Sequence, residues 1–295
     1  MTMRIAKRSS MRLALLALLV LPFLAASAIA QPAKIFLAST GSDSNDGSRF
    51  SPKRSLQAAH DAVASGGSLV ILDTAGYGPL TITKSVDVTV PPGVNGFSTN
   101  PNGGTAIFID AGATANVSLR GLIVEGTGTL DDGGTGIRVR DVGSLTLDDC
   151  KIRNFTTGVG MIPVSSANLV MRGGSIIDTV DGLYVQANTA FIKVAADING
   201  VLVDHATYFG LRAASFANAT VTMTIRRCTV TGSNEAILTD GAVTIIVDGC
   251  TLAGNQYAFF KKDSSGTIVS RGNNTLVNNV AKINSPNTVV VQAGE

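Results

Sequence analysis

The stretch LTLDDCKI at residues 145–152 returns as MTIRRCTV at 223–230 and as IIVDGCTL at 245–252. Each copy has a short strand of alternating apolar and polar residues, a small residue at a tight bend, and a second apolar segment. The apolar residue that follows the bend has equivalents along the chain, at intervals of 22 to 29 residues: Ile123, Ile152, Ile176, Leu202, Val230, Leu252 and Leu276. A drifting period in this range, with three short strands per unit, predicts a β-solenoid. In that fold Ile152, Ile176, Leu202, Val230 and Leu252 would stack inward in one column, and Ile123 and Leu276 are their equivalents on the flanking coils.

Residues 1–30 have the pattern of a secretory signal peptide. Basic residues as far as Arg12 precede an apolar core at Leu13–Leu24, and Ala28–Ala30 has the small-x-small form of a cleavage site. An uncleaved membrane anchor is the competing interpretation, and the apolar run is short for it. We therefore expect a secreted, periplasmic or cell-surface protein with no transmembrane span after cleavage.

The charge of the chain depends on this segment. The sequence has 23 basic and 21 acidic residues, a net charge of +2. Four of the basic residues and none of the acidic ones lie in residues 1–30, so the remainder carries a net charge of −2. The basicity of the whole chain is a feature of export, and no nucleic-acid partner is expected.

We expect residues 31–67 to form an N-terminal strand and a capping helix, and residues 68–295 to form the solenoid. Apolar residues on one side of Leu56–Val63 indicate a helix, with Ser55 as the N-cap and Gly66 as part of the stop signal. Such a helix would cover the apolar end and the unpaired strand edges of the first coil.

The entry segment carries a resemblance to a known family. IFLASTGSDSNDG at 35–47, LQAA at 56–59, SLVIL at 68–72 and GYGPLTI at 76–82 together resemble the start of secreted right-handed parallel β-helix proteins. This is the pectate-lyase-like superfamily, which includes alginate lyase and chondroitinase-B relatives. The resemblance implies an all-β chain, a single right-handed parallel β-helix of about eight coils with an N-terminal capping helix, and carbohydrate as the class of ligand. It does not imply a particular chemistry, because binding proteins share the motif.

Three cysteines occupy one position of the repeat. Gly174 and Gly200 fill that position between Cys150 and Cys228, and Cys228 and Cys250 fall on adjacent coils. One interpretation is a stack of buried free thiols. The other is a Cys228–Cys250 disulfide in an oxidising compartment, which the distance of about 4.8 Å between strands permits but parallel Cβ vectors disfavour.

Aligning the coils predicts an outward column of side chains: Arg138, Gly160, Tyr184, Arg212, Leu238 and Phe260. A second polar group lies in the adjoining turns: Asp178, Asp181, Asp204, His205 and Tyr208. In the column, Tyr184 offers an aromatic face to a sugar ring, and Arg212 and Arg138 are suited to carboxylates. These three are the predicted substrate-binding residues.

Uronate lyases and epimerases need a group that neutralises the carboxylate, a base, and a proton donor for the leaving oxygen. Arg212 is the candidate for neutralisation, with His205 and Tyr208 as candidate base and acid. Asp178 and Asp204 are candidate oxygen ligands for Ca²⁺, the one cofactor considered. The alternative for the two aspartates is a structural turn ladder, because Asn154, Asp178, Asp204 and Asn278, together with Glu125, are predicted to share one turn position.

The chain departs from characterised lyases. It has no compact chondroitinase-type lysine and arginine pair, and no recognisable tripled-aspartate calcium arrangement. Asp148 and Asp149 would point to opposite faces of a strand, so they are a poor glycosidase pair. Two functions remain: an exported protein that binds an acidic polysaccharide, with or without lysing or epimerising it, or a non-catalytic adhesin or scaffold at the cell surface.

Overall fold

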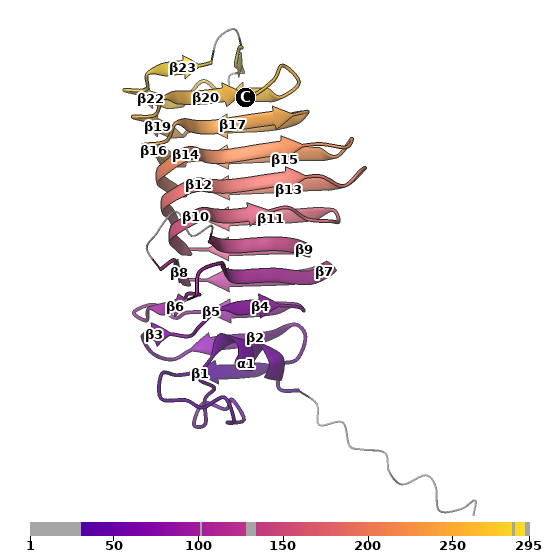
Figure 1. Ribbon diagram of the computed structural model, residues 1–295, viewed down its shortest axis with the longest axis vertical. Helices are drawn as coiled ribbons and strands as arrows, with labels where there is room; N and C mark the ends of the chain where they lie inside the picture. The colour runs from indigo at the N-terminus through magenta and orange to yellow at the C-terminus, as the bar shows by residue number, and fades with distance from the viewer. Residues whose placement is uncertain (1–30, 101, 128–133, 285–286, 293–295) are drawn as a thin grey trace, which may run out of the picture. The chain divides into compact units, whose positions relative to one another are not determined.

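A computed structural model describes residues 31–100, 102–127, 134–284 and 287–292. The predicted signal peptide lies outside these residues. From Pro32 onward the chain forms one compact unit, and the described part contains 24 strands and one helix. Every strand pairing is parallel, and the strands form three faces that wind around a common core (Figure 1).

The first face consists of β1 (Lys34–Leu37), β2 (Gly67–Ile71), β5 (Val86–Thr89), the ends of β7 (Thr105–Arg120) and β9 (Thr135–Asp148), β11 (Ala167–Arg172), β13 (Lys193–Asn199), β15 (Thr220–Arg226), β18 (Val243–Asp248), β21 (Thr267–Ser270) and β24 (Val290–Val291). The second face consists of β3 (Ala75–Gly76), β6 (Gly96–Ser98), β8 (Ile123–Glu125), the starts of β10 (Lys151–Met161), β12 (Ser175–Ala187) and β14 (Leu202–Ser215), β16 (Thr229–Thr231), β19 (Thr251–Ala253) and β22 (Thr275–Val277). The third face consists of β4 (Leu80–Ile82), the starts of β7 and β9, the ends of β10, β12 and β14, β17 (Glu235–Gly241), β20 (Tyr257–Lys261) and β23 (Ala281–Ile283).

This architecture confirms the predicted fold. The chain is an all-β, right-handed parallel β-helix of about 8 turns with a single helix in its described part. Alternate residues of each strand point inward, and the inward columns of Leu, Ile and Val form one continuous core.

The predicted inward column is right at most positions and wrong by one residue at two. Ile152, Ile176, Val230 and Leu252 are fully buried, as expected. Between Ile176 and Val230, however, the inward residue is Val203, and Leu202 is 37% exposed. Likewise, the column begins at Val124 rather than at Ile123.

The error has a simple cause. Residues 122–124 and 201–203 are each three apolar residues in a row, so alternation alone does not say which of them points inward. The corner at Gly200, where φ is +68°, sets the phase and turns Val203 inward. Val201, not Gly200, therefore occupies the position of the cysteines.

All three cysteines are free and buried. The thiol of Cys150 donates to the Leu119 carbonyl at 3.2 Å, that of Cys228 to the Arg226 carbonyl at 3.2 Å, and that of Cys250 to the Asp248 carbonyl at 3.4 Å. The structure thus agrees with the first interpretation, in which the thiols satisfy carbonyl groups at the corner between the first and second faces.

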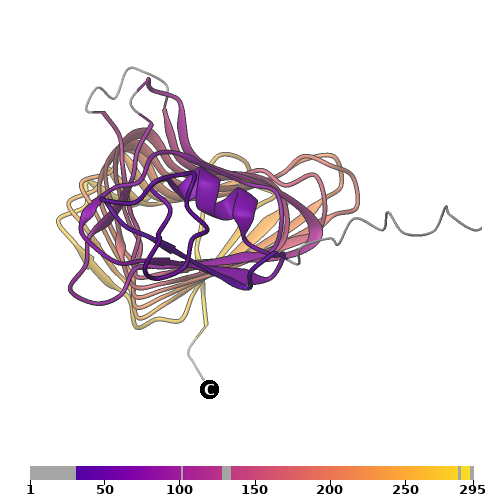
Figure 2. The same ribbon diagram turned by 90° about the horizontal axis from the view of Figure 1, so that it is seen from below.

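The capping helix α1 (Leu56–Ala62) lies across the N-terminal end of the stack (Figure 2). Ser55 accepts a hydrogen bond from the Ala58 N–H at 3.2 Å, which confirms the predicted N-cap. Leu56 and Ala59 are fully buried, and the helix contacts β1, β2 and β4. The helix therefore covers strands β1 and β4 as well as β2.

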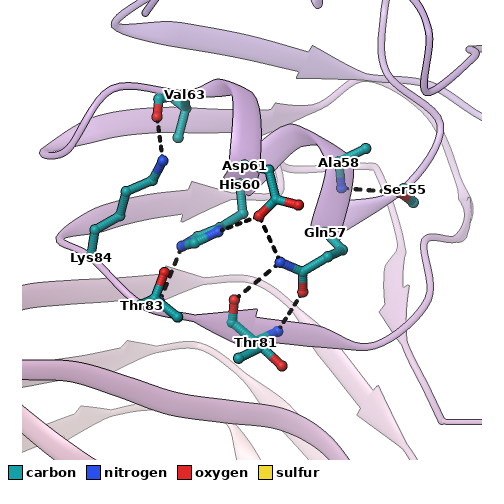
Figure 3. Close-up of polar contacts among 9 residues, drawn as sticks. All are labelled: Ser55, Gln57, Ala58, His60, Asp61, Val63, Thr81, Thr83 and Lys84. Atoms are coloured by element: carbon teal, nitrogen blue, oxygen red, sulfur yellow. Dashed lines mark hydrogen bonds and ion pairs between the residues drawn. The ribbon is translucent and has the colours of Figure 1, made fainter.

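Polar contacts fix this helix to the segment that begins in β4 (Figure 3). Gln57 accepts from the Thr81 N–H at 2.8 Å, and His60 Nε2 accepts from the Thr83 N–H at 3.2 Å. Lys84 donates to the Val63 carbonyl at 2.6 Å, just beyond the helix. His60 is only 1% exposed, so its role is structural.

Candidate functional site

The predicted register of the outward column is confirmed on the third face, although Gly160 and Leu238 within it are buried. Gly160 of β10 pairs with Arg138 of β9 and with Tyr184 of β12, and Tyr184 pairs with Arg212 of β14. Leu238 and Phe260 continue the column. We call the third face from Arg138 to Arg212, together with Tyr208, the ladder face.

Arg212 is held by its neighbours rather than solvated. Its guanidinium lies 4.5 Å from the ring centroid of Tyr184 and 5.4 Å from that of Phe209. It also donates a hydrogen bond to Asp240, and the same carboxylate accepts a hydrogen bond from Lys262 at 3.0 Å. With a side chain only 17% exposed, Arg212 already has its charge balanced within the protein.

A one-residue insertion places the aromatic residues beside it. The register of β12 and β14 shifts between Thr179 and Asp181, so β14 has one residue more than β12 at this bend. Phe209 consequently pairs with Asp181, and Tyr208 lies next to it in the bulge. The Tyr208 ring is 5.5 Å from that of Phe209 and the residue is 48% exposed. Tyr208 is therefore available to a ligand, whereas Phe209 is buried.

Arg138 is the free cation of the ladder face. It is exposed, and it makes no hydrogen bond or ion pair with any residue that the structure describes. Gly160, its neighbour in the column, has no atom closer than 3.6 Å to the position of a Cβ. Gly160 is itself buried, and methyl groups of Thr157 and Thr135 lie 3.6 and 3.9 Å from that position, so it presents no side chain between Arg138 and Tyr184.

Two acids, Asp181 and Glu235, lie near Arg212. The sequence pattern pointed to Asp181 but not to Glu235. Asp181 and Glu235 both pair with Phe209, from opposite sides. Glu235 is 5% exposed, and burial raises its pKa to about 7 against the opposing effect of Arg212 and Lys262. Burial also raises the pKa of Asp181, again opposed by Arg212.

Buried polar atoms without a hydrogen-bond partner gather in this region. Within the described residues there are five such side-chain atoms: Thr179 Oγ1, Asp181 Oδ1, Arg212 Nε, Glu235 Oε2 and Thr239 Oγ1. All five belong to three successive third-face strands, β12, β14 and β17. Buried polar groups are nearly always hydrogen-bonded, so this local concentration of exceptions singles out the region around Arg212 as the candidate site.

His205 and Asp204 lie at the corner before the bulge. His205 has φ +52° and shares the left-handed turn position with Asn154 and Asp178, where φ is +62° and +53°. The prediction that Asp204 and Glu125 share this position is wrong, by the same one-residue slip. Asp204 instead pairs with Ile177 on the second face, accepts from the Thr231 hydroxyl, and lies 3.0 Å from His205 Nδ1.

The predicted site residues are thus only partly brought together. Tyr184 and Arg212 are in contact, and Tyr208 joins them through Phe209, but no contact in the described part of the chain connects His205 to Arg212. The candidate calcium ligands Asp178 and Asp204 occupy different positions of the repeat. Across the described ranges, no group of three or more His, Cys, Asp or Glu residues could hold a metal ion.

A separate hollow lies on the second face. It has a volume of about 300 Å³ and is lined by residues that include Phe97, Lys151, Arg153 and Ile177. Arg153 is paired there with Glu125 at 3.0 Å. The hollow does not include the residues of the ladder face.

The sequence matches no family model and no curated protein. Two solved structures are similar in fold. A rhamnogalacturonan lyase aligns with a TM-score of 0.58 and 13% identity, over 83% of this chain and 74% of that one. A pectate lyase, Pel9A, aligns with a TM-score of 0.57 and 13% identity, over 86% and 78%. At this identity the likeness establishes the fold alone. In the described residues, no helix is long and apolar enough to cross a membrane.

Proposed function

We propose that this protein is exported and binds an acidic polysaccharide along the ladder face. The observation that carries the proposal is the register that puts Arg138, Gly160 and Tyr184 on successive rungs. Parallel strands repeat at about 4.8 Å, so the column offers a regular series of contacts to a polymer. Two similar folds belong to enzymes named for rhamnogalacturonan and pectate, which supports a polymer of this class.

Each residue has a distinct part in this proposal. Arg138, exposed and without a partner among the described residues, offers a planar fork of donors to a uronate carboxylate. Gly160 places no side chain between the arginine and the aromatic residues, and Tyr184 and Tyr208 offer aromatic surfaces to the sugar rings. Arg212, which the sequence suggested as the carboxylate ligand, holds Tyr184 in place instead, because Asp240 already balances its charge.

Lysis or epimerisation by Arg212, His205 and Tyr208 is a separate proposal with less support. Arg212 would have to exchange Asp240 for a substrate carboxylate, and His205 is turned toward Asp204. The contacts of the ladder face support binding more directly than catalysis.

The test is the affinity of the purified protein for polygalacturonate, compared with a neutral polymer such as dextran. We expect Arg138→Ala to weaken binding by roughly fivefold to tenfold, about 1 to 1.4 kcal/mol. The matched control is Arg172→Ala, which removes an exposed arginine from β11 on the first face. Equal affinity of Arg138→Ala and wild type would remove the ladder face as the binding site. Ultraviolet absorbance of unsaturated uronate, monitored in the same mixtures, tests lysis independently.

A further inference from the structure

Glu235 is the acid of the third face that no binding or catalytic role has yet explained. Its carboxyl is nearly fully buried, and its Oε2 has no hydrogen-bond partner in the part of the chain that the structure describes. The side chain lies in the column between Phe209 of β14 and Tyr257 of β20. An ionised carboxylate in such surroundings is costly unless it is paired, so the group retains a proton to unusually high pH.

Charged groups of both signs lie near Glu235, on its own strand and on strands of the adjacent coils. Arg212 of β14 and Lys262, just after β20, both lower the pKa of Glu235. Asp240 of its own strand, β17, accepts from both of those cations, and Asp181 of β12 lies on the far side of Phe209. With Glu235 neutral, Arg212 and Lys262 both pair with Asp240, and Arg212 also acts on Asp181. Ionisation of Glu235 adds a negative charge to this group.

We infer that Glu235, by binding or releasing one proton, sets the charge behind the ladder face and so determines how strongly that face holds an anionic polysaccharide. The inference rests on the proposed function. Arg212 connects Glu235 to the ladder face, because its charge acts on Glu235 and its guanidinium lies against the ring of Tyr184. An anionic polymer should bind well while Glu235 is protonated and less well once it is ionised, because like charges repel in a weakly solvated site. Glu235 acts here on charge and position, and does not contact the polymer.

The experiment measures polygalacturonate binding at constant ionic strength, about one pH unit below and one above the pKa of about 7. Polygalacturonate stays ionised throughout this range. We expect the wild-type affinity to fall by about threefold or more between the two conditions, because a coupling of about fivefold, the lower end of common values, acts on a group that is about 90% protonated in one and about 10% in the other. Glu235→Gln, a permanently uncharged isostere, should retain the affinity of the acid condition at both. Glu125→Gln, which removes the partner of Arg153 on the second face, should behave as the wild type does.

A second measurement does not depend on the variants. The carboxyl carbon of Glu235 in the wild-type protein reports its protonation by nuclear magnetic resonance. Because linkage is reciprocal, bound polygalacturonate should move the titration midpoint of Glu235 to higher pH.

The outcomes separate the two proposals. Binding that is insensitive to pH, a Glu235→Gln variant that weakens with pH as the wild type does, or a midpoint unmoved by the polymer would overturn the inference and leave the proposed function standing. No binding of the wild type at either pH would overturn both.

Discussion

The burial of Glu235 has a calculable effect on folding. Its pKa is about 7 in the folded chain, against an ordinary value of 4.5. Between these values the unfolded chain has released the proton while the folded chain still holds it. Stability therefore falls as pH rises from about 4.5 to about 7, and then remains level. In neutral and alkaline solution, this residue destabilises the β-helix.

Replacing Glu235 with Gln should therefore stabilise the protein at the pH values at which the buried carboxylate lowers the stability of the wild type. At alkaline pH we expect the free energy of unfolding to rise by about 1 to 3 kcal/mol, with the gain disappearing in acid below the ordinary pKa. Urea unfolding of both proteins at several pH values measures this. A gain of equal size at every pH would show that the effect is packing rather than charge.

The slip at Leu202 provides a matched pair of substitutions. Val203 is fully buried and Leu202 is 37% exposed, although both are apolar neighbours in β14. Val203→Asp buries an unpaired charge and should cost several kcal/mol, on the order of a domain's whole stability. Leu202→Asp should cost less than about 1 kcal/mol, because that side chain faces solvent. Circular dichroism and urea unfolding of the two variants would decide the register, and a reversed order would show that the assignment from sequence was right.

These residues show what the sequence could and could not predict. The outward column from Arg138 to Phe260 was predictable because glycines and single apolar residues fix the phase of each coil. The position of Val203 was not, because residues 201–203 are all apolar. Glu235 was missed for another reason: its burial arises from Phe209 and Tyr257 of adjacent coils, and a polar residue at the start of a strand gives no sign of this by itself.

At the scale of an element, α1 depends on an unprotonated histidine. His60 Nε2 accepts the Thr83 N–H, and Nδ1 lies 3.2 Å from Asp61. Burial lowers the pKa of His60, the Asp61 carboxylate opposes this, and Lys84 adds to it. Protonation would turn the acceptor of the Thr83 bond into a donor, so the cap and β4 would lose one of the contacts in Figure 3.

The sign of the pH effect follows from the lowered pKa. Below the ordinary value of 6.5 the unfolded chain takes up a proton at His60 before the folded chain does, so stability is lost as pH falls through that range. His60→Gln retains an acceptor for Thr83 but does not titrate, and should lose less stability than the wild type on acidification. The chain has only one other histidine, His205, whose side chain is 67% exposed. His205→Gln should follow the wild-type profile, and a His60→Gln profile that also follows it would contradict this account.

The helix itself was predictable, and its attachment was not. The apolar stripe and Ser55 locate α1 to within a residue or two of its observed bounds. The contacts to Thr81 and Thr83 depend on where β4 passes beneath the helix, which is a property of the coil path rather than of local sequence.

Deleting residues 31–66 would expose the edges of the first coil, and we expect aggregation of the shortened protein, measured by light scattering. A soluble, monomeric product would show that the cap is dispensable.

The whole molecule is a stack in which each coil pairs only with the coil before it and the coil after it. Stability in such a stack is nearly a sum of local terms, so its two ends need not unfold together. The N-terminal end is covered by α1. The last described coils are less well buried. Val277 is 42% exposed, Val280 is 74% exposed, and Leu276 packs against the core but is only partly buried.

The three cysteines provide probes along this axis. Cys150 lies before β10, Cys228 before β16 and Cys250 before β19, and all are buried, so each thiol becomes reactive only when its own coil opens. As urea is raised, pulses of a thiol reagent followed by mass spectrometry should label Cys250 first, then Cys228, and Cys150 last. The order follows because Cys250 is closest to the poorly covered coils and Cys150 is closest to the capped end. Simultaneous labelling of all three would show that the β-helix opens as one cooperative unit, and labelling of Cys150 first would show that the cap, rather than the far end, is where unfolding begins.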